Sequence, residues 1–130
     1  MKLTIPYYLH KVGAGFPSPA TDYIEDDIDL NSHLITNAPA TFIIRVQGKS
    51  MTNVGIYDGD LLIVDKSLNP KNFSTVIANI NEELVVKTFI KEKNQSFLTS
   101  GSKKLEDKIN LTENPEIVIW GIVTYVIHAL

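Results

Sequence analysis

Short runs of apolar and β-branched residues, separated by turn signals, extend from residue 41 to the end of the chain. Val, Ile, Phe and Thr are common in these runs, and such residues fit the pleated, partly buried surface of a strand. Asp58-Gly59 and Asn81-Glu82 are typical of tight connections between strands. Residues 101–114 are polar and predict a loop. The predicted strands cover residues 41–47, 60–65, 75–80, 83–91, 96–99 and 117–127.

One segment has the spacing of a short helix. Leu30 and Leu34 are four positions apart, which places them on the same face of a helical turn. Asp29 precedes them and is a favourable N-cap residue. The Asn-Ala-Pro sequence at residues 37–39 ends the segment, so the predicted helix lies within residues 29–35.

The first 28 residues predict an extended arm. Pro6, Pro17 and Pro19 fall within the first 20 residues, and each fixes its own φ and biases the preceding residue away from the α region. We therefore expect an N-terminal arm over residues 1–28 and a single, mainly β domain over residues 29–130.

Composition narrows the possible functions. The length of 130 residues suits one hydrophobic core, and the absence of cysteine excludes a disulfide scaffold, an Fe–S centre and a thiol nucleophile. The formal net charge of -3 leaves no strongly cationic surface to neutralise a run of phosphates. We therefore expect no direct, specific binding to DNA.

No segment has the pattern of a membrane anchor or an export signal. The apolar C-terminal stretch, residues 117–130, has 14 residues, whereas a bilayer span needs about 20. Near the N-terminus, Pro6 and Lys11 interrupt the apolar region that a signal peptide requires. We expect a cytoplasmic protein that does not enter a membrane.

Several common site motifs are incomplete. Residues 48–50, Gly-Lys-Ser, match the end of a phosphate-binding loop, but Ile43 stands where that loop needs its first glycine. The acidic residues between 25 and 29 lack the alternation and the glycine of a calcium loop. The histidines lie in no catalytic sequence context and are interpreted as surface or boundary residues. They are His10, His33 and His128.

A lysine in the predicted strand 83–91 is a candidate general base. Lys87 lies at mid-strand, and Val85 and Phe89 are its neighbours on the same face. An apolar environment disfavours the charged ammonium, and the neutral amine can take a proton from a serine. The alternative on this pattern alone is a lysine whose charged end reaches water at the edge of the sheet.

Ser50 is the corresponding candidate nucleophile. It follows an apolar strand and Gly48, in a segment whose tight turn can present a hydroxyl together with backbone N–H groups. The alternative is that Ser50 only caps the turn before residues 51–53.

Gly-Lys-Ser-Met at residues 48–51, the Gly-Ile-Tyr-Asp-Gly-Asp segment that begins at residue 55, and Val-Val-Lys at residues 85–87 form a combination of motifs. In this combination the chain resembles the LexA-like serine/lysine self-cleaving proteases, and within that family the UmuD-like accessory subunits of error-prone DNA polymerases. The similarity spans about residues 12–91 and, more loosely, the apolar C-terminal strand. The segment after the family's cleavage point corresponds to Gly-Phe-Pro-Ser-Pro-Ala-Thr-Asp-Tyr at residues 15–23. The other matching segments are residues 28–31, 48–51, 55–65 and 85–87.

The resemblance implies a fold and a set of site residues. The expected fold is a mainly β, LexA-like catalytic domain of twisted antiparallel sheets, with one short helix and an extended arm. Ser50 would be the nucleophile, Lys87 its base, and Ala14-Gly15 the bond that is cut. Backbone N–H groups of Ser50 or Met51 would stabilise the oxyanion. The resemblance implies neither a metal nor a cofactor.

The resemblance also implies partners. They are a RecA filament on single-stranded DNA, which stimulates cleavage, and the catalytic subunit of a Y-family polymerase. Apolar surface on the predicted helix and on residues 117–130 predicts a homodimer. The alternative is the self-cleaving C-terminal domain of a LexA-like or phage repressor. A membrane signal peptidase with the same two residues is disfavoured, because no segment is long enough to span a bilayer.

Overall fold

The computed structural model describes residues 2–8, 26–101 and 108–130. Contacts divide the chain into two units, Met1–Thr36 and Asn37–Leu130.

The first unit contains a small strand pair and the predicted helix. Strand β1 (Ile5–Tyr7) pairs with β2 (Asp26–Ile28) in antiparallel orientation. Helix α1 (Leu30–Leu34) follows, and its N-cap Asp29 accepts a hydrogen bond from the N–H of Asn31 at 3.1 Å. The predicted helix and its cap are therefore confirmed. The strand pair was not predicted, because strands of three residues are too short to show an alternating pattern.

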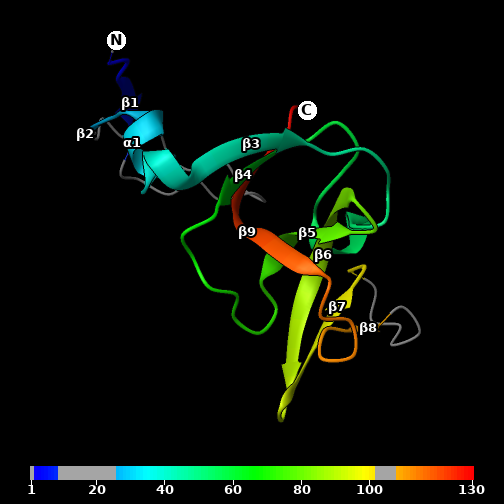
Figure 1. Ribbon diagram of the computed structural model, residues 1–130. Coiled ribbons are helices and arrows are strands. Elements are labelled where there is room, and N and C mark those ends of the chain that lie inside the picture. The colour runs from blue at the N-terminus through cyan, green and yellow to red at the C-terminus, as the bar shows by residue number, and fades with distance from the viewer. Residues whose placement is uncertain (1, 9–25, 102–107) are drawn as a thin grey trace. The chain divides into compact units, whose positions relative to one another are not determined.

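Within the described part of the second unit, seven strands form one antiparallel sheet (Figure 1). Their spatial order is β3-β4-β9-β5-β6-β7-β8, so β9, although last in the sequence, lies inside the sheet between β4 and β5. The predicted mainly β fold with antiparallel strands is confirmed. The strands are β3 (Thr41–Arg45), β4 (Leu61–Asp65), β5 (Thr75–Ile80), β6 (Glu83–Glu92), β7 (Gln95–Thr99), β8 (Ile109–Asn110) and β9 (Val118–Ile127). Two 3-10 helices, η1 (Ala38–Ala40) and η2 (Thr52–Val54), lie on either side of β3 in the sequence.

Two predictions from the pattern need correction. Strand β3 ends at Arg45 instead of residue 47, and Val46 instead exchanges hydrogen bonds with the turn before β4. The predicted loop at residues 101–114 contains β8, in which Ile109 pairs with the buried Leu98 of β7. A strand of two residues carries no periodic signal, so only the pairing reveals it.

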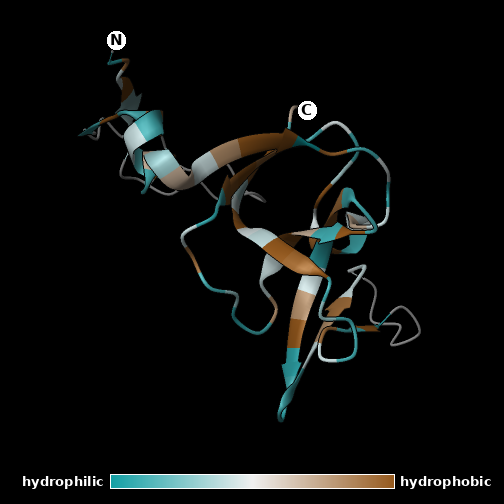
Figure 2. Cartoon of the chain, viewed as in Figure 1, coloured by the Kyte–Doolittle hydropathy of each residue, from teal (hydrophilic) through white to brown (hydrophobic). Residues whose placement is uncertain are grey.

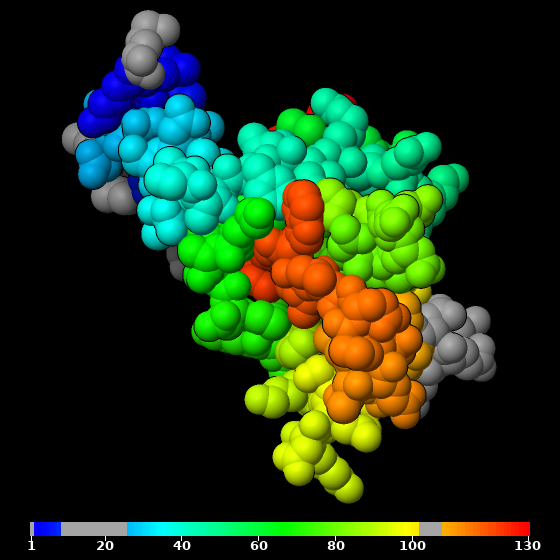
Figure 3. All heavy atoms as spheres, in the orientation of Figure 1, coloured from blue at the N-terminus to red at the C-terminus, as the bar shows by residue number. Residues whose placement is uncertain are grey.

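Apolar side chains form two core clusters. Figure 2 shows apolar residues concentrated on the strands, and polar residues on the loops and on the tip of the β6–β7 hairpin. That tip projects from the body of the unit (yellow, Figure 3). The first cluster consists of Val46, Met51, Ile56, Leu62, Val64 and Ile77. The second consists of Val76, Ala78, Phe89, Leu98 and Ile122.

Strand β9 approaches β4 closely at Gly121. A Cβ at this position would lie 2.6 Å from Val64 Cγ1 and 3.2 Å from the carbonyl oxygen of Asp65. The registers of β9 with β4 and with β5 both shift near this point. Glycine is therefore required here for close packing in the centre of the sheet.

Candidate active site

A glycine turn leads from β3 to the serine. The chain leaves β3, buries Val46 and then turns at Gly48, whose φ of 105° lies in the region that favours glycine. The N–H of Gly48 donates to Asp58 Oδ1 at 2.7 Å. After this turn Ser50 is exposed, whereas Met51 is only 2% exposed.

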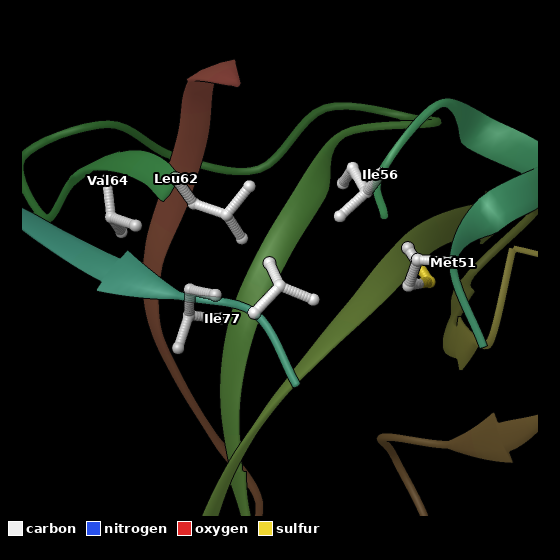
Figure 4. Packing of buried hydrophobic residues seen from close by; sticks show 6 residues of the cluster. Met51, Ile56, Leu62, Val64 and Ile77 are labelled. Carbon is white, nitrogen blue, oxygen red and sulfur yellow. The ribbon is translucent and has the colours of Figure 1, made fainter. Parts of the chain in front are cut away.

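The core anchors the residue that follows Ser50. The side chain of Met51 lies beside Ile56 at the end of the first cluster that is farther from Val64 (Figure 4). The carbonyl of Met51 accepts hydrogen bonds from Val54 N–H at 3.1 Å and from Ile56 N–H at 3.2 Å. Within the described part of the chain, no hydrogen bond uses the N–H of Ser50 or of Met51. Both groups can therefore donate to a developing oxyanion.

The turn before β4 braces the chain that leads to the serine. The N–H of Val46 donates to the carbonyl of Asp60, and the N–H of Gly59 donates to the carbonyl of Val46, both at 2.8 Å. Arg45 Nη1 also donates to the carbonyl of Gly59 at 2.9 Å. These hydrogen bonds hold the end of β3 against the turn formed by residues 57–60.

Asp60 is a buried carboxylate with two partners. It is 3% exposed; Oδ2 accepts the N–H of Tyr57 at 2.8 Å, and Oδ1 lies 2.5 Å from His128 Nδ1. Burial acts to raise the pKa of Asp60. The hydrogen bonds from Tyr57 and His128, together with the charge of His128, outweigh burial and hold this pKa below its ordinary value of 3.8. Asp60 is therefore an ionised group at neutral pH.

The lysine comes from a different part of the sheet. Lys87 lies in the middle of β6, opposite Val76 of β5, and is half-buried. Ser50 and Lys87 both line one cleft of about 390 Å³. The other lining residues come from the end of β3, the turn after it, β5 and the first half of β6: Ile44, Arg45, Val46, Gln47, Gly48, Met51, Ile77, Glu83, Leu84, Val85 and Val86.

The other residues singled out from the sequence do not line this cleft in the described part of the chain. Ala14 and Gly15 lie outside the described residues. His128 is a boundary residue, as interpreted from the sequence, but its contact with buried Asp60 was missed. No sequence signal points to that contact, because the two residues are far apart along the chain. Among the described residues, no group of three or more His, Asp or Glu side chains is arranged to hold a metal ion. No helix in the described ranges is long and apolar enough to cross a bilayer.

The sequence pattern of the Peptidase S24-like family matches residues 6–124, and the chain belongs to this family. The chain is 42% identical to protein ImpA of Salmonella typhimurium over 123 residues, which are 95% of this chain and 83% of ImpA. It is 35% identical to protein MucA of Escherichia coli over 122 residues, 94% of this chain and 83% of MucA. It is 37% identical to the LexA repressor of Hahella chejuensis over 106 residues, 81% of this chain and 52% of the repressor.

These relatives confirm the predicted resemblance to LexA-like and UmuD-like proteins. The chain is a UmuD-like member of a family of self-cleaving serine peptidases. That membership connects it with the SOS response and DNA repair.

Proposed function

We propose that this protein is an SOS mutagenesis factor that cleaves its own arm between Ala14 and Gly15, with Ser50 as the nucleophile and Lys87 as the base. Residues 15–130 are then the processed accessory subunit of an error-prone translesion polymerase. The observation that carries the proposal is the single cleft lined by both Ser50, which follows β3, and Lys87 of β6. The surrounding family supplies the reaction class, acyl transfer to a serine.

The reaction needs the arm in the cleft as an extended strand. The neutral amine of Lys87 takes the proton of Ser50 Oγ, and Oγ attacks the carbonyl carbon of Ala14. Backbone N–H groups of Ser50 and Met51 stabilise the oxyanion that forms. The protonated lysine gives its proton to the departing nitrogen of Gly15, and water then hydrolyses the ester between Ser50 and Ala14.

The residue types at the proposed cut suit this chemistry. Ala14 has a small side chain that fits a shallow pocket, and Gly15 allows the two backbones to approach closely. The chain from the cut to Asp26, where the next described strand, β2, begins, is long enough to span tens of ångströms when extended.

The proposed partners are proteins. A RecA filament on single-stranded DNA stimulates cleavage by favouring the docked arm, and a Y-family polymerase subunit binds the processed product, both in the cytoplasm. The net charge of -3 supports contact with protein instead of direct contact with DNA. A homodimer is supported by exposed apolar side chains on β3 and at the end of β9, namely Ile43, Tyr125 and Ile127.

Mass spectrometry of the purified protein at alkaline pH tests the cleavage. The wild type is expected to yield a fragment that begins at Gly15, whereas Ser50→Ala and Lys87→Ala are expected to remain intact. Lys91→Ala is the matched control, because Lys91 is an exposed lysine on the same strand. Cleavage at Ala14-Gly15 in either the Ser50 or the Lys87 variant would remove that residue from the mechanism.

A further inference from the structure

The register of the sheet places the C-terminal histidine beside a buried carboxylate. Leu61 of β4 pairs with Ile127 of β9, so the residues before and after them, Asp60 and His128, are neighbours across the two strands. His128 Nδ1 lies 2.5 Å from Asp60 Oδ1. A carboxylate only accepts hydrogen bonds, so the imidazole is the donor. The histidine side chain is 44% exposed, whereas Asp60 is buried.

Asp60 and His128 together hold both ends of one turn. Asp60 closes the turn at its C-terminal end and uses Oδ2 to accept the N–H of Tyr57, the first residue of the turn. The ring of Tyr57 also lies against the His128 ring, with 5.3 Å between the ring centroids. Without the imidazole of His128, Asp60 Oδ1 would be a buried carboxylate oxygen that lacks this hydrogen bond. The loss would destabilise the ionised carboxylate in its buried position.

The same turn holds the main chain that leads to Ser50. Its three hydrogen bonds to that chain are from Val46 N–H to the Asp60 carbonyl, from Gly59 N–H to the Val46 carbonyl, and from Gly48 N–H to Asp58 Oδ1. Ser50 follows two residues after Gly48. A displacement of the turn therefore displaces the backbone that carries the nucleophile.

We propose that His128 is a positioning residue for self-cleavage. Its hydrogen bond to Asp60 holds the turn at residues 57–60 in place, and this turn holds the backbone before Ser50. This inference rests on the proposed function. His128 is not among the residues that line the cleft, so it acts through Asp60 and does not touch the reacting atoms. The low pKa of Asp60 agrees with this role, since an ionised carboxylate makes the stronger hydrogen bond.

The test compares self-cleavage rates of the wild type, His128→Ala, His128→Lys and Leu130→Ala at one pH and at a temperature where all four are folded. Lysine keeps a hydrogen-bond donor at this position, and Leu130 is an exposed neighbour that serves as the control. His128→Ala is expected to cleave about tenfold or more slowly, because small displacements of reacting groups cost large factors in rate. His128→Lys is expected to recover the rate to within about threefold of the wild type.

Three results would overturn the proposal. The first is a wild-type rate in His128→Ala, and the second is an equal loss of rate in Leu130→Ala. The third is an equal rate in the alanine and lysine variants, since a hydrogen-bond donor to Asp60 would then make no difference. If the Asp60–His128 pair had only a structural role, His128→Ala would lower the unfolding midpoint and leave the self-cleavage rate of the folded protein unchanged.

A second measurement separates this inference from the proposed function. Hydrogen exchange is followed at the amides of Tyr57 and Gly48 in a Ser50→Ala background, with the amides of β7 as the internal reference. This measurement does not depend on self-cleavage. His128→Ala is expected to speed exchange at Tyr57 and Gly48 and to leave β7 unchanged. Unchanged exchange at both amides refutes the coupling even if the wild type cleaves. If amide exchange is faster in the His128→Ala variant but the wild type does not cleave itself, the coupling between His128 and the turn stands and the proposed function is refuted.

Discussion

Thr88 on β6 is 8% exposed, and among the described residues its Oγ1 is the buried side-chain polar atom that lacks a hydrogen-bond partner. A buried hydroxyl without a partner costs roughly 1–3 kcal/mol of stability, because it loses its hydrogen bonds to water. Valine keeps the shape of threonine at Cβ and suits a strand equally well, but it has a methyl group in place of the hydroxyl. Thr88→Val is therefore expected to raise the free energy of unfolding by about 1–2 kcal/mol.

Thr124 provides the matched control for this substitution. Its Oγ1 donates to the carbonyl of Ile63 at 3.3 Å, so Thr124→Val removes a hydrogen bond that exists. The same chemical change is expected to lower stability there by about 0.5–1.5 kcal/mol. The two threonine variants should thus change stability in opposite directions.

Urea unfolding in a Ser50→Ala background measures both effects without interference from cleavage. The single tryptophan, Trp120, lies on β9 and contacts Phe42 edge-to-face, so its fluorescence reports the packing of the sheet. A higher midpoint at an unchanged slope is expected for Thr88→Val, with a rise in melting temperature of roughly 3–8 °C. A lower midpoint for Thr88→Val would refute the reasoning, because it would mean that the hydroxyl has a stabilising partner.

Four further predictions concern strain, packing, acid stability and the pH dependence of cleavage. Gly121→Ala is expected to lower stability by about 1–3 kcal/mol in the same urea assay, because the new Cβ would clash with Val64; an unchanged midpoint would contradict the close packing. Phe73 has a φ of 70° and is 70% exposed, so Phe73→Gly is expected to raise stability by about 0.5–1 kcal/mol, and a loss would show that the ring has a packing role. The pKa of Asp60 is lower in the folded chain than its ordinary value of 3.8, so its contribution to stability is present above that value and is lost as the pH falls through the lower, folded value. The difference in urea midpoint between the wild type and Asp60→Asn is therefore expected to shrink from about pH 7 to about pH 3, and a constant difference would contradict this. Finally, an amine base works only when neutral, so the self-cleavage rate is expected to rise between about pH 6 and pH 10, and a rate independent of pH would contradict a role for Lys87.

Local structure could be predicted from the sequence where a few neighbouring residues determine it. The N-cap Asp29 and the helix after it depend on residues within one turn, and the structure has both. Strand β5 has the predicted bounds, because its apolar run is long enough to indicate a buried strand. The Ser50 and Lys87 segments also carried enough local identity to indicate the family, which the relatives confirm.

Tertiary structure alone decided which of these segments meet. Strand β8 exists because Ile109 has Leu98 of β7 to pair with, and two residues contain no pattern of their own. The contact between Asp60 and His128 depends on the pairing of β9 with β4, and no spacing along the chain encodes that register. The cleft likewise requires the end of β3 and the middle of β6 to lie close together in one sheet. Periodicity reports which side of an element is buried, but not which distant element buries it, because that choice is made by packing across the whole sheet.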